Sequence, residues 1–72
     1  MRTNDILQII IAGGSLHIDS RKHSISEMLL MANSAKLSKV RIFFENTEKM
    51  TLTDKLRLSF TGKDYVEFLD LV

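Results

Sequence analysis

Residues 24–45 read SISEMLLMANSAKLSKVRIFFE, a helix-forming stretch followed by a short strand-forming one. Ser24 and Glu27 have the spacing of a capping box, in which each side chain satisfies a free backbone N–H group at the start of a helix. In residues 40–44 (VRIFF), branched and aromatic side chains show the period-two alternation of a strand. The stretch therefore predicts one helix-then-strand unit.

The same unit occurs on both sides of this stretch. It becomes visible when Asp5, Glu27 and Asp54 are set in register, and the capping-box spacing recurs from Thr51 to Asp54. The aligned sets are Asn4, Ser26 and Thr53 before the acidic residue, Leu7, Leu29 and Leu56 two residues after it, and Gly13, Ala35 and Gly62 at the predicted helix ends. The sequence thus predicts three tandem units, at about residues 3–19, 24–45 and 51–71.

The aligned residues predict where each helix begins and ends. The small polar residue before each acidic residue is expected to accept hydrogen bonds from the first free N–H groups, and the acidic residue faces the positive end of the helix dipole. Gly13 and Gly62 are expected to supply the positive-φ position that commonly ends a helix. Ala35 is an imperfect copy, which needs Asn33 or a longer loop instead.

The predicted strands are joined by single helices, so they are expected to be parallel and connected by right-handed crossovers. Their alternation indicates that helices cover only one face of the sheet. We expect the covered face to hold Leu16, Ile18, Val40, Ile42, Val66 and Phe68, and the open face His17, Asp19, Arg41, Phe43 and Glu67. The predicted fold class is α/β: one domain over residues 1–72, a solenoid-like series of three helix–strand repeats.

Composition excludes several classes of protein. The chain has 72 residues, a net charge of +1 from 10 basic and 9 acidic side chains, and no cysteine. This argues against disulfide scaffolds, thiolate metal sites and general nucleic-acid binders. The apolar run at residues 6–12 is too short to span a bilayer and makes a poor signal peptide, so we expect no membrane partner and a cytoplasmic location.

Residues 16–35 and 40–62 each combine a strand, a polar turn and a helix that begins with Ser or Thr ahead of an acid-x-Leu motif. This pattern resembles the helix-and-strand repeats of small bacterial leucine-rich-repeat-like proteins, although it lacks their asparagine ladder. The resemblance implies a fold and a tendency to bind proteins. The origin expected for the chain is bacterial or phage. It implies no catalytic residue.

We find no convergent set of residues for catalysis, a cofactor or a metal. His17 and His23 flank Asp19, but this set has too few ligands for a metal site and does not recur in the other units. Two of the four nearby serines fit helix caps, and no nucleophile motif surrounds any of them. The loop at residues 13–15 follows a helix, whereas phosphate-binding loops precede one. We therefore expect a protein that is not an enzyme.

Residues 21–23 (RKH) form a basic loop that nearby cations could extend. The candidate anion contacts are Arg21, Lys22, Lys39 and Arg41. Such a patch could hold a phosphate backbone with little sequence preference, so a nucleic-acid-binding accessory protein is the alternative function.

Apolar surface at the ends of the series favours a protein partner. Residues 28–31 (MLLM) are four successive apolar residues, which one helix cannot hide against one sheet face, and the final segment reads as an edge strand. The predicted interface residues are Met28, Met31, Phe43, Tyr65, Leu69 and Leu71. The leading prediction is a small non-enzymatic protein–protein interaction module that forms a homo-oligomer or binds an unidentified protein.

Overall fold

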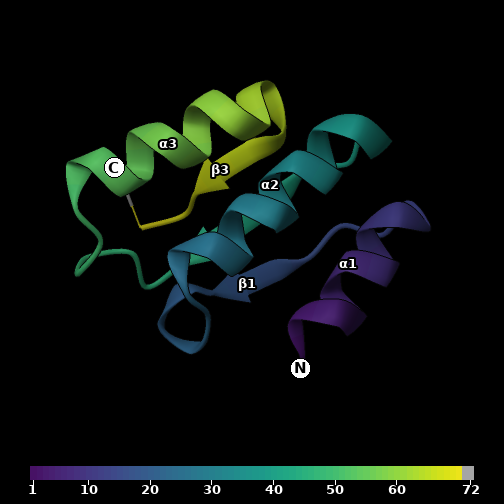
Figure 1. The fold of residues 1–72 in the computed structure, drawn as a ribbon, viewed down its shortest axis with the longest axis horizontal. Helices are drawn as coiled ribbons and strands as arrows, with labels where there is room; N and C mark the ends of the chain where they lie inside the picture. Colours follow the sequence, from purple (N-terminus) through teal and green to yellow (C-terminus); the bar gives the residue numbers. More distant parts are fainter. Residues whose placement is uncertain (71–72) are drawn as a thin grey trace.

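The computed structural model describes residues 1–70, in which three α-helices alternate with three short strands (Figure 1). The elements are α1 (Thr3–Ile11), β1 (His17–Asp19), η1 (Ser20–Lys22), α2 (Ile25–Ser38), β2 (Ile42–Glu45), α3 (Leu52–Gly62), η2 (Lys63–Tyr65) and β3 (Val66–Phe68). Within this part of the chain, none of the helices has the length and apolar character that a bilayer crossing requires. The mixed α/β class predicted from the sequence is confirmed.

The three acidic residues that set the sequence register occupy the same place in their helices. Asp5, Glu27 and Asp54 each lie at the third helical position. Glu27 and Ser24 form the predicted capping box: the Ser24 Oγ accepts from the Glu27 N–H at 3.2 Å, and Glu27 Oε1 accepts from the Ser24 N–H at 2.8 Å. At α3, the Thr51 hydroxyl accepts from the Asp54 N–H at 3.1 Å.

The prediction that Asn4, Ser26 and Thr53 cap the helices is wrong. These residues lie inside the first turn, at the second helical position, because each helix begins two residues earlier than a cap at these positions requires. The capping residues are Arg2, Ser24 and Thr51, and Arg2 makes no side-chain cap hydrogen bond. The first helix therefore begins without the side-chain acceptor that the other two have.

The two glycines at helix ends serve different purposes. Gly13 has a φ of 98°, which confirms its predicted role as a positive-φ helix stop. Gly62 has a φ of −93°, so the same prediction is wrong for Gly62, and the positive φ of 52° falls on Lys63. A Cβ atom on Gly62 would lie only 2.1 Å from Val66 Cγ2. Gly62 is thus needed for close packing between helix and strand.

The middle helix is longer than the sequence register predicts. α2 continues through Ala35 and ends at Ser38, and the φ of 57° at the next residue, Lys39, provides the left-handed turn. Ala35 is fully buried, because it lies on the side of α2 that packs into the core. The helix therefore continues past the position where the other two units have glycine, and neither Asn33 nor a longer loop ends it.

The strands form one parallel sheet in the order β1–β2–β3. One register row joins His17, Phe43 and Glu67, and the next joins Ile18, Phe44 and Phe68. The parallel sheet predicted from the sequence is confirmed. β1 and β3 are its two edge strands, as the order of the strands requires.

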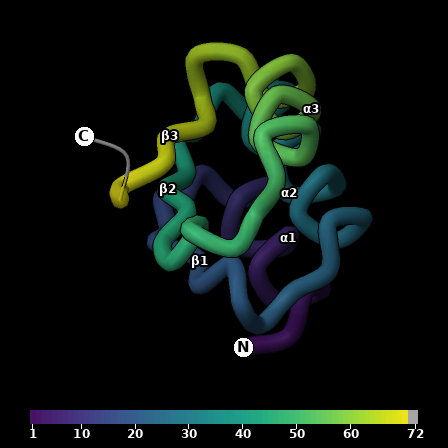
Figure 2. The backbone as a smooth tube through the Cα atoms, turned by 90° about the vertical axis from the view of Figure 1, so that its left-hand side faces the viewer, coloured from purple at the N-terminus to yellow at the C-terminus, as the bar shows by residue number. Residues whose placement is uncertain are grey.

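The sheet and the helices form two layers, with the strands on one side and the helices on the other (Figure 2). The core between the layers contains Ile6, Ile10, Ile18, Met28, Met31, Ala32, Ala35, Val40, Ile42, Phe44 and Leu58. His17, Arg41 and Glu67 lie exposed on the other face of the sheet. The predicted division of strand residues between a covered and an open face is therefore confirmed.

Candidate functional site

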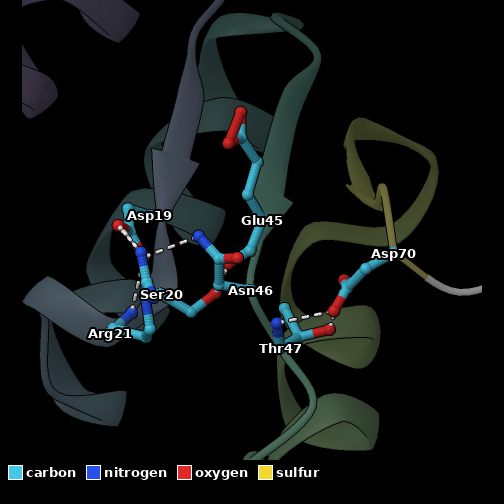
Figure 3. Close-up of polar contacts among 7 residues, drawn as sticks. All are labelled: Asp19, Ser20, Arg21, Glu45, Asn46, Thr47 and Asp70. Atoms are coloured by element: carbon cyan, nitrogen blue, oxygen red, sulfur yellow. Dashed lines mark hydrogen bonds and ion pairs between the residues drawn. The ribbon is translucent and has the colours of Figure 1, made fainter.

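A row of hydrogen-bonded polar side chains follows the carboxyl ends of the strands (Figure 3). Asp19 Oδ1 accepts hydrogen bonds from Arg21 Nε at 3.1 Å and from Asn46 Nδ2 at 3.2 Å. Asp19 Oδ2 accepts from Arg21 Nη2 at 3.0 Å. The Ser20 hydroxyl donates to the carbonyl oxygen of Glu45 at 2.6 Å. Two side-chain contacts thus join the ends of β1 and β2.

The row continues to the end of β3 through Thr47, which is fully buried. The Thr47 N–H donates to Asp70 Oδ2 at 2.8 Å, and its hydroxyl donates to Asp70 Oδ1 at 2.6 Å. These bonds, chiefly the one from the hydroxyl, hold the pKa of Asp70 below its ordinary value. Likewise, the hydrogen bonds from Arg21 hold the pKa of Asp19 well below its usual range.

This row joins strand ends and is poorly suited to proton transfer. A carboxylate that is held ionised by hydrogen bonds is a weak base at neutral pH, where a general base works best with a pKa near 7. Within residues 1–70, no group of three or more His, Cys, Asp or Glu side chains could hold a metal ion. What the geometry supports is a structural role: the three strand ends are fixed to one another.

The four basic residues predicted to contact an anion are divided between opposite ends of the sheet. Arg21 and Lys22 follow β1, whereas Lys39 and Arg41 precede β2. The strands are parallel, so the two pairs do not come together. Arg21 is bound to Asp19, and Arg41 Nη1 lies 3.6 Å from Glu67 Oε2. Anion binding by either pair stays a prediction.

The two histidines lie in separate surroundings. His17 Nδ1 lies 3.1 Å from Glu45 Oε1 on the open face of the sheet, and its ring centroid lies 5.0 Å from that of Phe43. The side chain of His23 is almost fully buried, and its Nδ1 lies 3.3 Å from the Thr3 hydroxyl. Each histidine therefore has its own partner on a different element.

Two of the six residues predicted to contact a partner, Met28 and Met31, are buried. Of the apolar run at residues 28–31, Met28 and Met31 belong to the core, because they lie on the inner side of α2, and Leu30 is the exposed member. Phe43 and Tyr65 are half-buried, Leu69 is exposed, and Leu71 lies outside the described residues. A surface available to a partner must therefore be sought elsewhere than at Met28 and Met31.

Such a surface lies on α3. Leu52, Leu56 and Phe60, here called the α3 stripe, are 72, 55 and 75% exposed. Their four-residue spacing places them along one side of the helix. The Lys63 ammonium lies 4.4 Å from the centroid of the Phe60 ring and borders the stripe. Three large apolar side chains thus stand in solvent on a helix of eleven residues.

Sequence reasoning missed the α3 stripe, although the alignment of the units contained a signal. Leu56 aligns with Leu7 and Leu29, which are half-buried where α1 and α2 each have a following helix beside them. α3 has none beside it within residues 1–70 (Figure 1). A residue that is covered in two units and uncovered in the third marks an end of the series.

A groove runs between α2 and α3 on the outer surface of the helices. Its lining residues are Leu29 from α2 and Thr53, Leu56, Arg57, Phe60 and Thr61 from α3. The groove shows that Leu29 faces α3, and it extends the apolar surface of the α3 stripe towards α2.

Comparison with known proteins adds no family to this description: no family model matches the chain, and neither the curated proteins nor the solved structures compared with it give a significant match.

Proposed function

We propose that this chain is a small non-enzymatic protein-binding module that associates with a second copy of itself through the α3 stripe. The observation that carries this proposal is the exposure of Leu52, Leu56 and Phe60 on one side of α3. Contiguous exposed apolar side chains bordered by polar residues are typical of protein–protein contact sites. A chain of 72 residues also buries a smaller share of its surface than larger domains, so covering this side of α3 adds stability.

The proposal includes a solenoid-like arrangement of the three units, in keeping with the resemblance to small bacterial leucine-rich-repeat-like proteins. Three findings support it: the parallel order β1–β2–β3, the common third position of the acidic residues, and the position of α2 between α1 and α3. Units of this kind cover each other's apolar sides and leave the last side uncovered. The α3 stripe is that last side.

The alternative, a nucleic-acid-binding accessory protein, stays a prediction. The basic residues that would serve it lie at two ends of the sheet, and Arg21 and Arg41 are each paired with a carboxylate. Binding to phosphates would weaken steeply with added salt, which apolar association does not. Measuring binding to DNA and RNA at two salt concentrations separates the two functions.

The test is the solution mass of the chain by sedimentation and light scattering over a concentration series. We expect the mass to exceed 8.2 kDa at high concentration, and Leu56→Glu to return it to that of one chain. Leu37→Glu is the matched control, because Leu37 is 74% exposed but lies on α2, away from the stripe. A parent chain that stays monomeric at millimolar concentration would overturn the proposal.

A further inference from the structure

We infer that the copies associate head to tail, with α3 and β3 of one copy against α1 and β1 of the next. This inference rests on the proposed function and names the surface that covers the α3 stripe. The packing of α3 against α2 inside one chain provides a template for the contact, because the units share one register.

In the template, α2 presents Leu29 and Ala32 to α3. Leu29 lines a groove whose α3 side is formed by Thr53, Leu56, Arg57, Phe60 and Thr61. Further along, a Cβ atom on Gly62 would lie 3.4 Å from Ala32 Cβ, so the two helices approach closely there. The contact thus joins the side of α2 with Leu29 and Ala32 to the side of α3 with Gly62.

The first and last units of the described chain each have an uncovered side that corresponds to one of these two sides. Leu56 and Ser59 of α3 align with Leu29 and Ala32, and both are exposed. The aligned receiving residues of the first unit are Asn4, Gln8, Ala12 and Gly13, all of them exposed. A Cβ atom on Gly13 would meet no atom within 4 Å, whereas one on Gly62 would meet two residues. The surface beside Gly13 is therefore open.

The edge strands are complementary as well. Continuing the register of the sheet by one strand sets Glu67 beside His17 of the next copy, and Phe68 beside Ile18. A carboxylate beside an imidazole is a favourable cross-strand pair. The added strand would also pair backbone groups along β3 and β1, the two edges of the sheet.

A hollow between α1 and β1 provides room for the contact. It has a volume of about 160 Å³; Met1, Ile6, Leu16 and Ile18 form its apolar lining, and His17, Asp19, Lys22 and His23 form its polar lining. A cavity of about 150 Å³ accepts a benzene ring. Phe68 is half-buried and stacks on Phe44, with ring centroids 6.1 Å apart, so its free side would face this hollow in the next copy.

A two-fold arrangement of β3 against β3 is less favourable. Centred on Glu67, the pairing would set Glu67 directly opposite Glu67 of the other copy, and like charges in that position are destabilising. The head-to-tail arrangement avoids this contact, because it sets β3 of one copy against β1 of the next.

The test uses two variants that each block one end. Leu56→Glu puts a charge on the α3 side, and His17→Pro removes an N–H group from the free edge of β1. The Phe43 N–H donates to the Leu16 carbonyl, and in a parallel ladder this register turns the backbone groups of His17 away from β2. Ala12→Arg is a second block of the first unit, placed where the template has a small residue. Circular dichroism establishes that each variant folds, and sedimentation measures the mass of each alone and of equimolar mixtures.

We expect the mass of the parent chain to rise with concentration without a plateau, because a head-to-tail contact leaves one free end on each assembly. Each variant alone should stay at 8.2 kDa, and a mixture of Leu56→Glu with His17→Pro or Ala12→Arg should give a species of twice that mass. If both first-unit variants still dimerise alone, the contact is two-fold: the inference fails and the proposed function stands. A monomeric parent chain contradicts both.

Discussion

Replacing Gly62 by alanine tests the packing between α3 and β3. The new Cβ would lie 2.1 Å from Val66 Cγ2 and 3.1 Å from Val66 Cβ, both on a stiff, β-branched side chain in a strand. Overpacking of this kind costs about 1–3 kcal/mol. The gain from replacing a helical glycine is about 0.5–1 kcal/mol. The overlap is therefore the larger effect, and we expect Gly62→Ala to lower the free energy of unfolding by about 1–2 kcal/mol.

Urea unfolding followed by circular dichroism measures this change as a lower midpoint with an unchanged slope. For a domain of this size the melting temperature should fall by roughly 4–16 °C. All variants must be compared at one protein concentration, because the proposed self-association would add stability. A neutral or stabilising Gly62→Ala would refute the close approach of the strand to the helix.

The cause can be separated from a general intolerance of alanine. Val66→Ala removes the overlapping methyl groups, so the double variant should be more stable than the sum of the two single changes predicts. Gly13→Ala is the control: its cost of about 1–2 kcal/mol comes from a φ of 98°, and Val66→Ala should not reduce that cost. Equal coupling of Val66→Ala to both glycine variants would contradict this explanation.

Two further predictions concern the helix start and the strand ends. Ser24→Ala should lower the free energy of unfolding by about 1 kcal/mol in urea titration because it removes the cap, whereas Ser26→Ala should be close to neutral; equal losses would contradict the assigned cap. The pKa of Asp19 is lowered in the folded chain, so its carboxylate stabilises the fold at pH values above 3.8, the ordinary pKa of this group. This contribution is lost as the pH falls, so Asp19→Asn should flatten the acid side of a stability–pH profile. An unchanged profile would show that the pairing with Arg21 does not favour the folded state.

Most of the fold could be predicted because it depends on local patterns. The period-two segments give the strands and their buried side, and the recurring acidic residue gives the common start of the helices. The capping-box spacing predicted the true caps Ser24 and Thr51, whereas the other candidates, Ser26 and Thr53, lie two residues further on and are chemically just as suitable. Pattern alone does not choose between neighbouring polar residues.

The candidate surface was predicted less well, because exposure depends on what lies beside a helix. Met28 and Leu30 are both large and apolar and lie two positions apart, yet one is in the core and the other in solvent. The polar row depends on contacts between residues more than twenty positions apart, such as Asp19 with Asn46 and Thr47 with Asp70. Such pairs become apparent only when the strands are placed side by side.

The central place of the second unit has a consequence for local unfolding. β2 has a strand on each side and α2 has a helix on each side, whereas β1, β3, α1 and α3 each have one such neighbour within residues 1–70 (Figure 1). Opening an outer unit breaks one contact between units, and opening the middle unit breaks two. Amide hydrogens of β2 should therefore exchange with solvent most slowly, with protection declining towards both edges of the sheet, and the outermost strands should fray while the centre stays folded.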